Sequence, residues 1–175
     1  MNVRLAAATD AAAIARVHVD SWRTAYKGIV ASAFLERLSH ERSQQWWENV
    51  LANPPARSCL HVLEADSEIV GFAYAGETRA PEFPYDAELS AIYILEEHQG
   101  KGGGRRLFDA VRTSLTNARF TSMLLWVLEN NPSRGFYDRL GGSIVASKQD
   151  KIGDDDVTEI AYGWIFAPPL RILAF

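Results

Sequence analysis

The sequence predicts an α/β fold, in which one mixed sheet of about seven strands is flanked by helices. Stretches of alternating or continuous apolar residues indicate the strands, and apolar residues three or four positions apart indicate the helices. Their order is strand, helices, three strands, helix, strand, helix and two strands, which differs from a regularly alternating doubly wound sheet. The length of 175 residues favours a single domain, expected at residues 1–167 and followed by an apolar tail at residues 168–175.

The first part of the chain is expected to form one strand and three helices. Thr9 or Asp10 is the expected N-cap of the first helix and Ser39 that of the third, because such side chains accept hydrogen bonds from the free amides of a first turn. Two prolines at residues 54 and 55 end the third helix. The expected elements are a strand over residues 2–6, a helix that ends before Gly28, a short helix around residues 32–38 and a helix over residues 39–51.

The rest of the chain is expected to form six strands and two helices. Residues 88–95 are apolar on both faces, which indicates a central strand. Asp66-Ser67 and Gly153-Asp154 are typical of hairpin turns, and Pro132 is expected at the first position of a helix. The expected strands cover residues 58–65, 69–75, 88–95, 122–128, 143–148 and 157–166, and the helices cover residues 104–117 and 132–140.

The composition argues against several function classes. The net charge is −4 and basic residues form no stripe, so nucleic acid is not an expected partner. Apolar runs are too short for a membrane span, and Met1–Arg4 does not predict a secretory signal. Cys59 is the single cysteine, which favours a reducing, cytoplasmic setting. The four histidines lack ligand spacing, so no metal is expected.

A glycine cluster between the central strand and a helix is the strongest local feature. The segment Gln99–Arg106 reads QGKGGGRR, and its glycines allow successive backbone amides to face one anion. Lys101, Arg105 and Arg106 add positive charge, so the segment predicts a pyrophosphate cradle. The spacing fits neither a Walker loop nor the dinucleotide fingerprint, whereas a plain flexible turn stays open.

Three blocks resemble one family. Ile92-Tyr93-Ile94 precedes Gln99, Gly102 and Gly104, which match a strand, a turn and Gln/Arg-x-x-Gly-x-Gly/Ala opening a helix. The other blocks are Asn130-Asn131-Pro132-Ser133-x-x-Phe136-Tyr137-x-x-x-Gly141 and Trp22-x-x-Ala25-Tyr26-x-Gly28. In these blocks the chain resembles the GNAT acetyltransferase superfamily, from Val3 to Phe166. The resemblance implies a mostly antiparallel sheet that is splayed between its fourth and fifth strands.

Two positions depart from the family pattern. Glu96 stands where many members have proline, and Gly103 stands where many have a branched apolar residue. The extra glycine is expected to make the loop more flexible.

The resemblance also implies acetyl-CoA as co-substrate, without a metal. Its binding residues are expected to be Ile92, Tyr93, Ile94, Gln99, Gly100, Lys101, Gly102, Gly103, Gly104, Arg105, Asn130, Ser133, Phe136 and Tyr137. The pantetheine arm is expected to pair with the backbone of Ile92 and Ile94 like an added strand. For Asn130 and Ser133, a role in capping the next helix is the alternative.

Three catalytic roles follow from the resemblance. The backbone amide of Ile94 is the expected donor to the oxyanion of a tetrahedral intermediate. Tyr137 is the expected general acid for the departing thiolate, with packing beside Phe136 as the alternative. Glu88 is the expected general base, acting through water; the alternatives are a solvated glutamate and water alone as the base.

The acceptor is expected to be a primary amine of a small molecule or a protein. Trp22 and Tyr26 are expected to line its pocket together with Tyr85 or Phe83, although core packing explains Trp22 equally well. The negative net charge loosely favours a cationic acceptor. A homodimer is also expected. The alternatives are a non-catalytic acyl-CoA-binding or sensing module on the same fold, and a nucleotide hydrolase.

Overall fold

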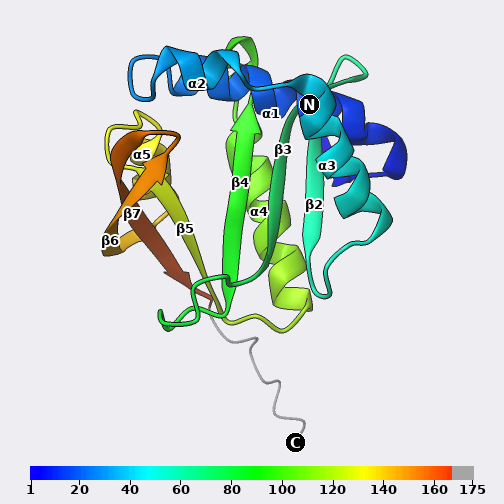
Figure 1. The fold of residues 1–175 in the computed structure, drawn as a ribbon. Coiled ribbons are helices and arrows are strands. Elements are labelled where there is room, and N and C mark those ends of the chain that lie inside the picture. Colours follow the sequence, from blue (N-terminus) through cyan, green and yellow to red (C-terminus); the bar gives the residue numbers. More distant parts are fainter. Residues whose placement is uncertain (167–175) are drawn as a thin grey trace, which may run out of the picture.

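The computed structural model describes residues 1–166, which form one seven-stranded sheet in the order β1-β2-β3-β4-β5-β7-β6 (Figure 1). The strands are β1 (Asn2–Leu5), β2 (Cys59–Ala65), β3 (Glu68–Glu77), β4 (Ala87–Ile94), β5 (Ser122–Leu128), β6 (Ser143–Ile152) and β7 (Asp155–Ile165). The helices are α1 (Ala11–Ala25), α2 (Ser32–Glu36), α3 (His40–Ala52), α4 (Gly103–Asn117) and α5 (Arg134–Arg139), with short 3₁₀ turns at Ala8–Asp10 and Glu96–His98. The element order predicted from the sequence is confirmed.

Helices cover both faces of the sheet. The inner stripe of α4, which includes Leu107, Val111 and Leu115, packs on one face. On the other face, Ile14 of α1 and Trp47 of α3 pack against the β2–β3 hairpin. Figure 1 shows α4 behind the strands, α3 in front of β2 and β3, and α1 and α2 across one end. The burial of these apolar stripes is what holds the layers together.

The sheet opens between its two central strands. Strands β4 and β5 are parallel and pair only at Ala87 with Met123 and at Glu88 with Leu124. Beyond these residues they diverge into the V-shaped opening of Figure 1. The expected splay between the fourth and fifth strands is therefore confirmed, and it leaves one edge of β4 without a partner strand.

A β-bulge at Ser90 sorts the side chains of β4 between the two faces. Leu89 pairs with Ala75 and Ala91 with Tyr74, so Ser90 has no counterpart in β3. An extra residue reverses the alternation of the strand that follows it. Ile92 and Ile94 consequently face α4, whereas Tyr93 faces α1.

Two local expectations were wrong. The carboxylate of Asp10 binds the amide of Ala7 at 2.7 Å and the Arg4 guanidinium, so it does not cap α1. The last hairpin is longer than the apolar pattern predicts, because its strands continue through a polar stretch up to the turn at Gly153. An ion pair between Lys148 and Glu159 at 3.0 Å joins the two strands in this stretch. Cross-strand charge pairs stabilise such stretches without apolar alternation.

One further expectation, the cap of α3, is confirmed, and another lies outside the described part. The Ser39 side chain caps α3 by accepting from the amide of Arg42. The apolar tail at residues 168–175 lies outside the described residues. Every helix within residues 1–166 is too short or too polar to cross a membrane. Within the same range, no group of three or more His, Cys, Asp or Glu side chains is arranged to hold a metal ion.

Candidate active site

A cavity of about 560 Å³ lies where the opened edge of β4 meets the glycine loop, the start of α4 and α5. We call it the loop cavity. It brings together residues that are up to 48 positions apart in the chain, because the two predicted βα units end side by side at the opening of the sheet. The predicted cofactor residues that line it are Ile92, Ile94, Gln99, Gly100, Gly102, Gly104, Arg105, Ser133, Phe136 and Tyr137.

The glycine loop is shaped to bind an anion. Gly102 precedes α4 with a φ of +83°, and Gly100 has a φ of +69°, a conformation that other residues rarely adopt. The free amides and the positive end of the 15-residue helix α4 follow directly. The guanidinium of Arg105 lines the cavity, and so does Arg139, which the sequence analysis missed. Loop, helix end and arginines together form a site suited to phosphate groups.

Gly103 has a structural explanation that differs from the expected flexibility. It is the first residue of α4 and is buried, and a Cβ added there would lie 2.5 Å from Cδ2 of Leu63 in β2. Leu63 is fully buried, so it has little room to move. Close packing of the helix against the sheet therefore favours glycine at this position, and the greater flexibility of the loop stays a prediction.

The unpaired edge of β4 presents backbone groups to the loop cavity. The amide of Leu95 donates to the carbonyl of Val70 in β3 at 2.9 Å. Because backbone groups of a strand alternate in direction, the N–H groups of Ile94 and Ile92 point the other way, into the opening. The Ile94 carbonyl accepts a hydrogen bond from Nε2 of Gln99 at 2.9 Å, which ties the glycine loop to the strand. The Ile94 amide is thus available to a ligand.

Tyr137 is a buried phenol on the wall of the loop cavity. Its ring packs against Phe136 and Tyr162, with centroids 5.4 and 5.6 Å apart. Within residues 1–166 its hydroxyl makes no hydrogen bond, so the phenol is available to a ligand. Burial, with a smaller contribution from Tyr26, raises the pKa of Tyr137 well above its usual value. The phenol therefore remains protonated at neutral pH, as a proton donor must.

Glu88 lies at the closed end of the opening. It is the last residue of β4 that pairs with β5, and it is 2% exposed. Arg79 donates to its carboxylate from the backbone amide at 3.1 Å, from Nε at 3.3 Å and from Nη2. Glu88 is thus a buried carboxylate paired with Arg79. It is not a solvated strand end, and it does not line the loop cavity.

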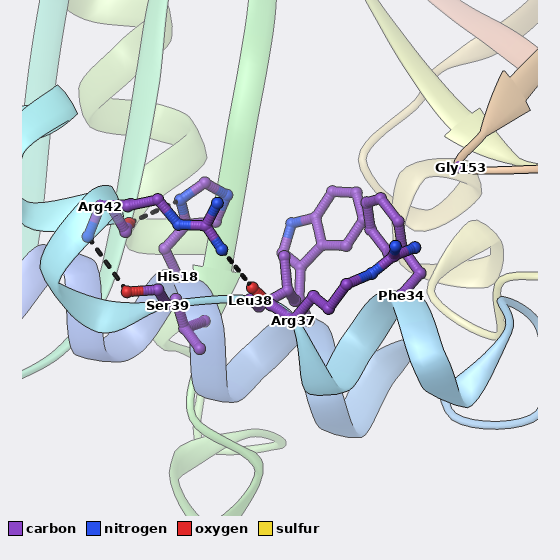
Figure 2. Close-up of a pocket in the computed structure, with 10 residues that line it drawn as sticks. His18, Phe34, Arg37, Leu38, Ser39, Arg42 and Gly153 are labelled. Carbon is purple, nitrogen blue, oxygen red and sulfur yellow. Dashed lines mark hydrogen bonds between the residues drawn. The ribbon is translucent and has the colours of Figure 1, made fainter.

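A second cavity of about 620 Å³ lies on the opposite face, between α1, the α2–α3 segment and the tip of the last hairpin. We call it the helix cavity. Its walls combine aromatic and apolar side chains with two arginines (Figure 2). The lining residues include His18, Trp22, Phe34, Leu38, Arg37, Arg42 and Gly153. The Trp22 ring lies 4.6 Å from that of Tyr26, which is buried behind it. The two predicted acceptor residues of α1 are thus brought together on this face.

Three tyrosines lie close together between the two cavities. Tyr26 follows α1 directly, Tyr93 lies in β4 and Tyr137 in α5. Burial raises the pKa of Tyr93 and Tyr26, and the proximity of Tyr26 adds to the raised pKa of both Tyr93 and Tyr137. These phenols and Trp22 therefore connect the wall of the loop cavity, which Tyr137 lines, with that of the helix cavity, which Trp22 lines.

Comparison with known proteins agrees with this geometry. Residues 14–142 match the family model of the acetyltransferase (GNAT) family. The chain belongs to the GNAT family of acetyltransferases. It is 37% identical over 176 residues to a Bacillus subtilis protein described as "Uncharacterized N-acetyltransferase YuaI", covering 99% of this chain and 98% of that one. It is 27% identical to a probable N-acetyltransferase of Mycobacterium tuberculosis, covering 79% of this chain and 78% of the relative.

Solved GNAT structures share the fold. The PaiA N-acetyltransferase of Thermoplasma acidophilum, solved with coenzyme A, superposes with a TM-score of 0.72 at 21% identity, covering 90% of this chain and 96% of that one. YncA of Salmonella typhimurium, solved with its cofactor acetyl-CoA, gives a TM-score of 0.71 at 20% identity, covering 95% of this chain and 94% of that one. At these identities the likeness concerns the fold, and this chain is a GNAT acetyltransferase by its family match.

Several predicted GNAT site residues lie away from the loop cavity. The side chain of Tyr93 faces α1, Lys101 is exposed and donates to the carbonyl of Glu97 at 2.8 Å, and Asn130 is exposed. The neighbouring Asn131 is buried instead, and its Oδ1 accepts from the amide of Ser133 at 2.8 Å, as a cap does.

The predicted aromatic residues of the 78–86 loop lie outside both cavities. Tyr85 packs over Gly163 of β7, and the ring of Phe83 lies 5.4 Å from that of Trp126. The sequence analysis missed His18, Arg37 and Arg42 of the helix cavity. His18 is one helical turn from Trp22, a spacing that would have identified it.

Proposed function

We propose that this GNAT acetyltransferase transfers an acetyl group from acetyl-CoA to a primary amine by direct attack. The observation that supports this most strongly is the meeting of three features in the loop cavity. These are the anion-binding glycine loop, the free amide of Ile94 and the buried phenol of Tyr137. Each supplies one requirement of acyl transfer: binding, oxyanion stabilisation and proton donation.

The residues of the loop cavity fit the cofactor. The pyrophosphate is placed at Gly100, Gly102 and the start of α4, with Arg105 and Arg139 as counter-charges. The pantetheine arm is placed along the free edge of β4, where Ile92 and Ile94 offer backbone groups as an added strand would need. This placement orients the thioester end toward the phenols at the wall between the cavities.

Bound acetyl-CoA supplies a thioester carbonyl that an amine can attack. The Ile94 amide donates a hydrogen bond to the carbonyl oxygen as negative charge develops on it. Tyr137 donates its phenolic proton to the departing sulfur. Glu88 takes the proton of the amine through water; its ion pair with Arg79 supplies the hydrogen bonds that a buried carboxylate needs. Water acting alone is the alternative, and the cytoplasmic homodimer stays a prediction from the sequence.

Calorimetric titration with acetyl-CoA tests the proposal. We expect micromolar binding by the wild-type protein and at least a 100-fold loss in Gly102→Glu, which places a carboxylate beside the phosphates. Gly28→Glu is the matched control, because Gly28 also has a positive φ (+78°) and open space around it but lies after α1. Equal binding by the wild type and both variants, or no binding by folded wild type, would contradict the proposal. Binding without thiol release for any amine would favour a non-catalytic module.

A further inference from the structure

The helix cavity carries positive charge, although the chain as a whole is acidic with a net charge of −4. Arg37 and Arg42 both line it and both are exposed, and no Asp or Glu is among its lining residues within the described part of the chain. Neither guanidinium forms an ion pair with a carboxylate of residues 1–166. Two unpaired arginines on one cavity wall attract an anion.

Backbone carbonyls hold both arginines in place. Nε of Arg37 donates to the carbonyl of Ala33 at 3.1 Å, and Nη2 of Arg42 donates to the carbonyl of Arg37 at 2.7 Å. The other guanidinium N–H groups have no partner within residues 1–166 and are available to a ligand. Figure 2 shows Arg42 at the His18 and Ser39 end of the cavity and Arg37 reaching toward Phe34. The two groups are thus anchored at different points of the same wall.

His18 adds a neutral donor. Nε1 of Trp47 donates to Nδ1 of His18 at 3.3 Å, which assigns the proton of the neutral ring to Nε2. Burial lowers the pKa of His18 to about 4, so the ring is neutral at physiological pH. Nε2 has no hydrogen-bond partner among the described residues. The N-terminal end of α3, capped by Ser39, borders the same space and also favours negative charge.

The helix cavity also has an apolar wall that extends toward the three tyrosines between the two cavities. Trp22, Phe34 and Leu38 line it, and the Trp22 ring packs on Tyr26, one of the three phenols at the opening of the sheet. A molecule held here therefore has its polar end at the arginines and its other end directed at the wall shared with the loop cavity. This is the arrangement that an acceptor with two different ends requires.

We propose that the helix cavity binds the anionic group of the acceptor, so that the substrate is an amine that also bears a carboxylate or phosphate. This inference rests on the proposed acetyl transfer. It selects among the amines that the sequence leaves open: Arg37 and Arg42 repel an acceptor that is only cationic, such as a polyamine, and attract one with a negative group. The local charge of the cavity, and not the net charge of the chain, sets this preference.

Binding of matched probe pairs tests the proposal without requiring turnover. The carboxylate pairs are L-phenylalanine with 2-phenylethylamine and L-methionine with 3-(methylthio)propylamine; the phosphate pair is O-phosphoethanolamine with ethanolamine. Each is titrated calorimetrically at millimolar concentration into the protein saturated with CoA. We expect the member with the carboxylate or phosphate, the anionic probe, to bind at least about tenfold more tightly than its partner, which carries only an ammonium group. The two kinds of pair identify which anion is preferred.

Arginine variants locate the binding. Arg37→Gln and Arg42→Gln are each expected to weaken binding of the anionic probe about tenfold and not to weaken binding of its ammonium-only partner. Arg112→Gln is the matched control, because Arg112 is an exposed arginine of α4 outside both cavities. Unfolding temperatures of all three variants show whether they fold.

The proposal is overturned if the ammonium-only probes bind as tightly as the anionic ones, if no anionic probe binds, or if the two variants bind like the control. Failure of the proposed acetyl transfer looks different. In that case acetyl-CoA does not bind, or no amine releases CoA, while the anionic probes still bind in an arginine-dependent way.

Discussion

Replacing Tyr137 by phenylalanine isolates the proposed proton donor, because the change removes one oxygen and keeps the ring. The ring stays among Phe136, Tyr162 and Trp164, with which it already packs. The hydroxyl makes no hydrogen bond within residues 1–166, so its loss leaves no described group without a partner. We therefore expect the free energy of unfolding to change by less than about 1 kcal/mol.

The expected loss in turnover is much larger than the loss in stability. A positioned general acid contributes about 10²- to 10⁴-fold, which corresponds to roughly 3–5 kcal/mol of the barrier. Because burial keeps the pKa of Tyr137 well above 10, the phenol is protonated over the whole assay range. The factor by which kcat falls is thus expected to be the same at neutral and mildly alkaline pH.

Thiol release at saturating acetyl-CoA and acceptor measures kcat, with any amine of the probe panel that is acetylated. Calorimetry measures the affinity for acetyl-CoA, which is expected to stay within about twofold, because the proposed role acts on the departing sulfur. Tyr74→Phe is the control, since Tyr74 of β3 packs against Trp46 and Trp47 away from both cavities. A kcat within threefold of wild type for Tyr137→Phe would refute the acid role, and an equal fall in both variants would point to a general loss of structure.

Two further predictions concern the other ionisable groups at the opening. Burial raises the pKa of Tyr26, Tyr93 and Tyr137 above the value of about 10 in an unfolded chain. The contribution of these protonated phenols to the free energy of unfolding is therefore expected to be fully present below pH about 10. Above that pH the free energy of unfolding is expected to fall by up to about 1.4 kcal/mol per pH unit and phenol. Urea unfolding between pH about 9 and 11 checks this, and simultaneous ionisation of all six tyrosines of the folded chain near pH 10 would contradict it. Glu88→Gln is expected to lower kcat/KM at least about tenfold. The loss of its ion pair is expected to cost only about 1 kcal/mol of stability, because the arginine side chain is 73% exposed. Full activity with reduced stability would assign Glu88 to the ion pair alone.

The loop cavity could be predicted largely from the sequence because its residues lie in short contiguous blocks. The glycines at 100 and 102 determine the backbone of the loop by their conformation alone, and the loop leads directly into α4. Phe136 and Tyr137 likewise follow a proline-marked helix start within a few residues. Local sequence sets local geometry in both cases, so motif and structure agree.

The proposed acceptor site could not be predicted in the same way, since its geometry depends on contacts between distant segments. Arg79 reaches Glu88 across the 78–86 loop, and Arg37 and Arg42 join His18 only because α2 and α3 fold over α1. Tyr85 was expected in the acceptor pocket but fills the space left by the missing side chain of Gly163. A tyrosine in a proline-containing loop gives no sequence signal for that choice.

The bulge at Ser90 links the two halves of the site. Without the extra residue, the strict alternation of β4 would place Tyr93 on the face opposite to Glu88; with it, both face the side of the helix cavity. The same shift turns the amides of Ile92 and Ile94 away from β3 and into the opening. One unpaired residue therefore directs the backbone of β4 to the loop cavity, the proposed cofactor site, and the Tyr93 side chain to the side of the helix cavity, the proposed acceptor site. This is why two cavities on opposite faces of the sheet can serve a single reaction centre.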